Sequence, residues 1–186
     1  MRSSIVGCST TQVRIVCAKR RIDIGALQDH PNFPLPLPGA NALNLASLIS
    51  LDSTVSQILV ASCVSDRDLT VLDLTRFSQL RRLVIGDNCF QFVKELRLIG
   101  FQELVSVKIG CQCFATSTVF MNGDSRCDFY LKNCPKLQYL TIDGFSFANA
   151  SVFEIENVDA LEEIDMGDVD EESINFQNAS LLLKSA

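Results

Sequence analysis

The cysteines are the residues of this chain best suited to chemistry, and three of them lie close together in the sequence. Cys111 and Cys113 are separated by one residue, and Cys127 follows further along. Thiolates bind zinc and act as nucleophiles. The spacing matches no standard set of zinc ligands, and no histidine follows His30 to complete one. We therefore predict no metal and no cofactor, and keep a thiol or metal site on these three cysteines as the alternative.

Other catalytic combinations are incomplete. His30 is the only histidine, and it precedes a proline in the Pro-rich stretch 30–39. A Ser-His-Asp or Cys-His arrangement would therefore depend on that one residue. No Gly-rich phosphate loop is present, and the carboxylates near 162–172 lack the spacing of a calcium loop. These patterns predict a protein that is not an enzyme and has no catalytic residues.

Most of the chain is instead built from one repeated phrase. Successive copies begin at leucines spaced 24, 33 and 24 residues apart, and the last copy is the weakest. Three copies read LRRLVIGDNCF, LVSVKIGCQCF and LQYLTIDGFSF. One position holds Cys89, Cys113 and Ser146, which predicts a column of small buried residues, and the next position is always phenylalanine. The copies begin at Leu80, Leu104, Leu137 and Leu161.

A second half-phrase fills the gaps between these copies. Its apolar residues alternate with polar ones, which is the periodicity of a β-strand. Each unit of about 24 residues therefore contains two short strands, and stacked units bury Leu on Leu and Phe on Phe. We predict a mainly β solenoid. The alternating pairs are Leu72/Leu74, Leu96/Leu98, Phe129/Leu131, Phe153/Ile155 and Ile174/Phe176.

The combination of LxxLxIGxxCF with FYLKNCPKL resembles the leucine-rich repeats of the BspA-like type, which are abundant in large protist protein families. The resemblance covers roughly residues 55–183. It implies a leucine-rich-repeat solenoid with strands on both broad faces and little helix. The usual role of this family is protein–protein recognition, which is the function that the resemblance implies here.

The predicted repeat domain covers residues 43–186, with an insertion at 115–127 that is a second candidate for binding. Residues 1–42 do not fit the repeat and predict an irregular segment with a Pro-rich linker. The stretch 43–63 fits either a degenerate first repeat or a short capping helix. The C-terminal end shows no polar cap, so we expect Phe176 and Leu181 to be exposed there. This exposure favours a fragment of a longer repeat array. A fragment with no independent function is therefore a further alternative.

Charge and hydropathy limit the classes of partner. The net charge of −6 argues against a nucleic-acid surface. The charged residues within 1–30 are mainly basic. From Lys136 onward, eleven acidic residues outnumber two lysines, which favours a partner with a basic surface. No apolar stretch is long enough for a membrane helix, and no signal peptide is evident. We expect a cytoplasmic protein with free thiols that binds another protein.

The residues between the buried positions of L-x-x-L-x-I should point outward and face solvent. They form columns that change from neutral or basic to acidic along the stack, and two tyrosines in them are the aromatic anchors expected in a binding hot spot. The columns are Arg82/Ser106/Tyr139/Glu163, Val84/Lys108/Thr141/Asp165, Arg97/Tyr130/Glu154 and Ile99/Lys132/Glu156. The candidate partner-binding residues are Arg82, Lys108, Tyr139, Thr141, Glu163, Asp165, Tyr130 and Glu154.

Overall fold

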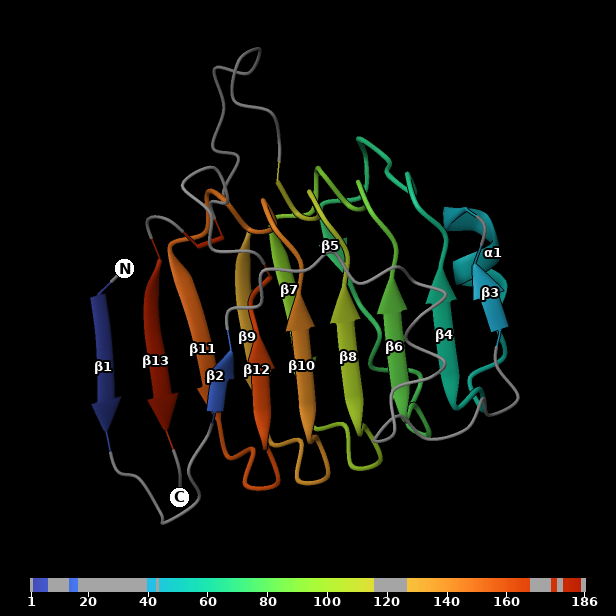
Figure 1. Ribbon diagram of the computed structural model, residues 1–186. Helices are drawn as coiled ribbons and strands as arrows, with labels where there is room; N and C mark the ends of the chain where they lie inside the picture. The colour runs from blue at the N-terminus through green and yellow to red at the C-terminus, as the bar shows by residue number, and fades with distance from the viewer. Residues whose placement is uncertain are drawn as a thin grey trace.

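The computed structural model of the chain is mainly β, with parallel strands stacked as a β-solenoid of about four turns (Figure 1). This confirms the predicted fold class. From β4 to β13 the strands alternate between two sheets, of seven and six strands, which lie face to face in Figure 1. The structure describes residues 2–6, 14–16, 40–42, 44–115, 127–167, 175–176 and 179–184.

The strands follow one another across each sheet almost in chain order. Sheet A contains, in spatial order, β1 (Arg2–Val6), β13 (Ser180–Lys184), β11 (Val152–Glu156), β9 (Asp128–Lys132), β7 (Glu95–Ile99) and β5 (Val71–Leu72). Sheet B contains β2 (Arg14–Val16), β12 (Glu163–Asp165), β10 (Tyr139–Ile142), β8 (Ser106–Ile109), β6 (Arg82–Ile85), β4 (Gln57–Val60) and β3 (Ala40–Ala42).

Equivalent positions of the repeat lie side by side, as the phrase predicts. Leu83 is in register with Val107, Val107 with Leu140, and Leu140 with Ile164. All four side chains are buried between the sheets. Burying a side chain of this size stabilises the fold by about 1.5–3 kcal/mol. One coil alone has no neighbour against which to bury them, so stability comes from stacking.

A row of phenylalanine rings runs along the core at the corners that follow strands β6, β8, β10 and β12. Phe114 stacks on Phe90 at 5.5 Å between ring centroids and on Phe147 at 4.7 Å, and Phe147 stacks on Phe176 at 5.0 Å. All four have a left-handed backbone, with φ between 50° and 54°. This conformation is costly for a bulky residue. The conformation recurs at all four rings, and each ring gains burial that offsets this cost.

The predicted column of small buried residues is present beside these rings. Cys89, Cys113 and Ser146 are all completely buried. Each side chain donates a hydrogen bond to a carbonyl in the preceding coil, at a point just after the sheet B strand. The donor–acceptor distances are 3.1 Å for Cys89 Sγ to Ala61 O, 3.0 Å for Cys113 Sγ to Gly86 O and 2.7 Å for Ser146 Oγ to Gly110 O.

A short helix, α1 (Leu45–Ser50), lies at the β3 end of the solenoid (Figure 1). The side chain of Asn44 accepts a hydrogen bond from Ser47 N, and Ser47 Oγ accepts one from Asn44 N, which forms a capping box. Arg76 Nη2 donates to the carbonyls of Leu48 and Ile49 at 3.0 and 2.6 Å and so satisfies groups at the helix C-terminus. Among the described residues, no helix is long and apolar enough to cross a membrane. The stretch 43–63 thus supplies both a helix and the strand β4.

The other end of the solenoid corrects two expectations. Phe176 does not belong to a sheet A strand: Phe153 and Ile155 are in register with Leu181 and Leu183, so β13 takes that place. Phe176 instead continues the ring row. The expected exposure of Phe176 and Leu181 is also wrong, because they are 0% and 7% exposed. The physical reason is that β13 lies between β11 and a further strand, β1.

The start of the chain supplies that further strand. β1 pairs in parallel with β13, and β2 pairs in parallel with β12, so both strands extend the sheets beyond the last coils of the repeat (Figure 1). β3 pairs with β4 at the opposite end of sheet B. The described strands of residues 1–42 therefore lie at both ends of the solenoid.

Candidate partner-binding faces

The columns predicted for sheet B exist, because the backbone register places their members side by side. Arg82, Ser106, Tyr139 and Glu163 form one row across β6, β8, β10 and β12. Val84, Lys108, Thr141 and Asp165 form the next row, two residues further along the same strands. Strand alternation directs both rows to the side of sheet B that faces away from the core.

These rows are not uniformly solvent-facing, which corrects the expectation from the sequence. Ser106 and Lys108 are 2% and 3% exposed, and Val84 is also buried. Arg82, Tyr139, Thr141, Glu163 and Asp165 are half-buried. Strand alternation determines which way a side chain points but not whether solvent reaches it. The centre of this face therefore does not present Lys108 to a partner.

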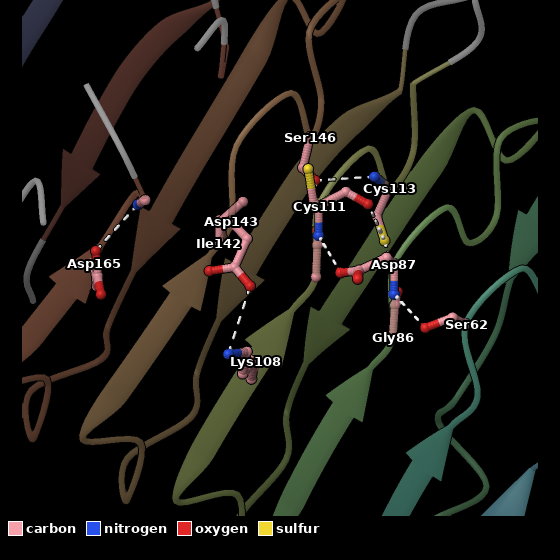
Figure 2. Close-up of polar contacts among 12 residues, drawn as sticks. Ser62, Gly86, Asp87, Lys108, Cys111, Cys113, Ile142, Asp143, Ser146 and Asp165 are labelled. Carbon is pink, nitrogen blue, oxygen red and sulfur yellow. Dashed lines mark hydrogen bonds and ion pairs between the residues drawn. The ribbon is translucent and has the colours of Figure 1, made fainter. Parts of the chain in front are cut away.

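Lys108 has an ionic neighbour that the sequence did not identify. Its Nζ lies 3.5 Å from Asp143 Oδ2, which follows the neighbouring strand β10 (Figure 2). Burial raises the pKa of the Asp143 carboxyl, and the Lys108 charge opposes that rise. Within the described part of the chain, Lys108 Nζ makes no hydrogen bond, and the same holds for Ser106 Oγ and Gln57 Oε1. Burying polar groups in this way is energetically unfavourable.

The β10–β12 part of sheet B is acidic. Tyr139 Oη lies 3.4 Å from Glu162 Oε2, and burial followed by the nearby Glu162 charge raises the Tyr139 pKa. Asp165 Oδ1 accepts a hydrogen bond from Gly167 N at 3.1 Å (Figure 2). This region therefore has the acidic character expected from the sequence, concentrated beside strand β2.

The outer face of sheet A carries the other predicted columns, and it is more open. Arg97 is in register with Tyr130, and Tyr130 with Glu154. The neighbouring row contains Ile99, Lys132 and Glu156. Arg97 is exposed and Ile99 is 37% exposed, whereas Tyr130 is half-buried. An exposed arginine, an isoleucine and a tyrosine thus occupy adjacent positions on two neighbouring strands.

Glu154 is the exception on this face, since it is 8% exposed rather than solvent-facing. Two lysines on the adjacent strands approach it, with Lys132 Nζ at 2.8 Å from Oε2 and Lys184 Nζ at 2.6 Å from Oε1. Lys132 also lies 3.1 Å from Glu156. These contacts, that of Lys132 first, lower the pKa of the Glu154 carboxyl. The network links three neighbouring strands.

The structure separates the three cysteines of the proposed thiol site into different environments. Cys113 lies in the buried column, and Cys127 is buried beside strand β9. Burial raises the pKa of both thiols well above the ordinary value, which disfavours the reactive thiolate. Cys111 is half-buried, and its backbone N–H donates to Asp87 Oδ1 at 2.8 Å (Figure 2). Among the described residues, no group of three or more His, Cys, Asp or Glu side chains is placed to hold a metal ion.

One residue of the column escaped the sequence prediction. Asn175 Nδ2 donates to Ile142 O at 3.3 Å, and its Oδ1 accepts from Ser146 N at 2.8 Å. Asn175 therefore takes the place of the cysteines and the serine in the next coil. The signal was present in the sequence, because each column residue directly precedes a phenylalanine of the ring row.

The predicted binding insertion lies mostly outside the described residues, which resume at Cys127 after Ala115. Comparison of the chain with protein-family models, with curated proteins and with solved structures gave no match. The fold thus defines the protein as a parallel β-solenoid built from repeats.

Proposed function

We propose that this protein is a non-catalytic protein-binding scaffold and that the outer face of sheet A is its docking surface. The observation that carries the proposal is the exposure of Arg97 and Ile99 beside Tyr130 on adjacent strands. The leucine-rich repeat of the BspA-like type is the class that we propose from the repeated phrase. A role in protein recognition is common for solenoids, because stacked repeats form extended binding surfaces.

The side chains of this surface have the chemistry of a binding hot spot. Tyrosine and arginine are enriched among residues that dominate binding energy, and such residues act best when surrounded by contacts that exclude water. Ile99 supplies exposed apolar area next to them, and Val71 on the edge strand β5 is 58% exposed. A partner would place apolar groups against Ile99 and Tyr130 and an acidic group near Arg97.

The contacts among the side chains of this face also favour binding. Glu154 is held between Lys132 and Lys184 at 2.8 and 2.6 Å, so three strands share one ionic network. Lys132 Nζ also lies 5.7 Å from the centre of the Tyr130 ring, a distance at which a cation–π attraction acts. A preorganised surface binds with a smaller entropic cost. A basic group of the partner would face Glu156 at the other end of this network, consistent with the expected basic partner surface.

The outer face of sheet B is the less favourable choice. Its central residues Ser106 and Lys108 are 2% and 3% exposed, so a partner has little access to them. Tyr139 and Glu163 remain half-exposed near the β12 end. They provide a matched control surface, because the same types of substitution can be made on both sheets.

The test is affinity capture from a lysate of the source organism with wild-type protein and two double variants. Arg97→Glu/Tyr130→Ala alters sheet A, and Tyr139→Ala/Glu163→Arg alters sheet B by the same kinds of change. We expect a specific partner that the sheet A variant loses and the sheet B variant retains. Loss in the sheet B variant alone, or capture of the same proteins by all three, would contradict the proposal. Unfolding curves of each variant provide the control for correct folding.

A further inference from the structure

We propose that strand β5 is an open, acidic edge of sheet A, to which a partner protein adds an extended segment that carries basic side chains. Sheet A ends at β5, whereas sheet B continues past β6 to β4 and β3 (Figure 1). Among the described strands, β5 therefore has a neighbour on one side only, which is β7. This inference rests on the proposed function only in taking a polypeptide as the ligand.

The backbone of β5 presents hydrogen-bonding groups to the open side. Val71 is in register with Glu95, and Thr70 O accepts from Lys94 N at 2.9 Å. Successive residues of a strand direct their backbone groups to opposite sides, so the N–H and C=O of Val71 point away from β7. Within the described part of the chain, no backbone bond outside the β5–β7 ladder reaches Val71. An extended polypeptide matches this pair of groups, because one residue of an antiparallel strand exchanges both bonds.

Solvent reaches this edge. Val71 is 58% exposed, and the nearby Thr70 and Asp73 are also exposed. The residues that continue the Val71 row into the sheet are less open, since Glu95 and Asp128 are half-buried. An exposed strand edge with unpaired backbone groups is a template for pairing with another chain. The edge of β5 is thus free to receive a further strand.

The side chains around the edge favour a basic segment. Asp66, Asp68 and Asp73 are exposed in the turns that precede and follow β5. Two hydrogen bonds from Thr75, at 2.6 and 2.9 Å, lower the pKa of the Asp73 carboxyl, so it is ionised at neutral pH. Opposite charges on neighbouring strands stabilise a strand pair. An added strand that carries lysine or arginine therefore pairs better than one that carries acids.

The two arginines near this edge contact other groups. Arg67 Cζ lies 5.7 Å from the centre of the Phe92 ring. Arg76 Nη2 donates to three carbonyls at the end of α1, at 3.0, 2.6 and 3.2 Å. A second copy of this chain would bring the same acids against the edge, and like charges disfavour pairing. The favoured occupant is therefore a segment of a different, basic protein.

The test uses a phage-displayed library of random peptides, depleted on the full-length Val71→Pro variant and then selected on wild type. Val71→Pro removes the N–H donor but no β5–β7 bond, and proline is tolerated where the N–H of an edge strand faces solvent. Val71→Thr is the matched control, because it keeps the N–H and a β-branched side chain. We expect peptides rich in lysine and arginine that bind Val71→Pro about tenfold more weakly than wild type and Val71→Thr almost unchanged. If no peptide distinguishes wild type from Val71→Pro, the proposal is wrong.

Two further readouts separate a lost backbone contact from a damaged fold. Hydrogen exchange of the Val71 amide in wild type should slow when the peptide is bound, and Asp73→Lys should weaken binding. An unprotected Val71 amide in the complex would overturn the proposal, as would self-association of wild type that Val71→Pro abolishes. Because Arg97→Glu/Tyr130→Ala leaves β5 unchanged, it should bind the peptide as wild type does, so failure here leaves the proposed docking surface unaffected.

Discussion

The corner column and the outer faces of the sheets occupy nearby positions of the same repeated phrase, but they differ in how strictly they repeat. In the column, Cys89, Cys113 and Ser146 are equally buried and make equivalent hydrogen bonds to the preceding coil. On the outer faces, in-register positions change from arginine to tyrosine to glutamate. Stacking fixes the residue type where each coil contacts the next, and it leaves the outer positions free for recognition. Substitutions should therefore separate stability from binding.

The largest loss of stability should follow from interrupting the ring row with Phe147→Ala. The ring is completely buried and stacks on Phe114 and Phe176 at 4.7 and 5.0 Å. We expect the free energy of unfolding to fall by about 3–5 kcal/mol, measured by chemical denaturation. Phe92→Ala is the matched control, since Phe92 is only half-buried. An equal loss in both variants would show that the row has no special role.

The next largest effect is expected within the column itself. Ser146→Ala removes the donor to Gly110 O and the acceptor of the Cys113 N–H, at 2.7 and 2.9 Å, and leaves both partners buried. The expected loss is about 2–3 kcal/mol. Ser146→Cys keeps a donor of the kind that Cys89 and Cys113 provide, so it should lose clearly less. If the two variants unfold at the same denaturant concentration, the hydrogen bonds do not explain the column.

Sheet B offers a substitution that should be neutral or stabilising. The double change Lys108→Met/Asp143→Asn removes a charge pair whose atoms are 3.5 Å apart and whose lysine is buried while its aspartate is half-buried. Replacing poorly paired buried charges with neutral groups often costs nothing, so we expect stability within about 1 kcal/mol of wild type or above it. Lys108→Met alone leaves Asp143 without its cation and should be less stable than the double variant. A large loss in the double variant would mean that the pair stabilises the fold.

Asp143 and Glu154 should contribute to the pH dependence of stability with opposite signs. Because burial raises the Asp143 pKa, the native state holds this proton more tightly than the unfolded chain, so its contribution favours folding as the pH falls. Lys132 and Lys184 lower the Glu154 pKa, so its stabilising contribution is present above about pH 4.3 and is lost as the pH falls through the lowered value. Unfolding titrations of Asp143→Asn and Glu154→Gln between neutral and acidic pH measure both contributions.

The smallest change in stability is expected on the proposed docking surface. Arg97 is exposed, and its contact with Glu95 at 2.7 Å is the kind of surface ion pair that contributes little to stability. Arg97→Glu/Tyr130→Ala should therefore unfold close to wild type while losing its partner. If this variant lost as much stability as Phe147→Ala, its loss of binding could be due to unfolding. That result would contradict the expected separation of stability from binding.

The repeat made most of the fold predictable from sequence. Leucine spacing and strand alternation gave the two sheets, and the recurring Cys/Ser position gave the column. Phe176 was placed wrongly because apolar alternation favoured a strand there. The better signal was the pair formed by a column residue and the phenylalanine that follows it, which recurs as Asn175 and Phe176. The burial of Lys108 and Glu154 was not predictable, since strand alternation gives the direction of a side chain but not the contacts that shield it from solvent.

The most direct test of the central claim is site-specific photo-crosslinking in the lysate. The photoreactive amino acid benzoylphenylalanine would replace Ile99 on sheet A in one variant and Thr141 on sheet B in another. The account predicts a covalent adduct with the captured partner from position 99 and none from position 141. An adduct from position 141 alone would contradict the assignment of binding to sheet A.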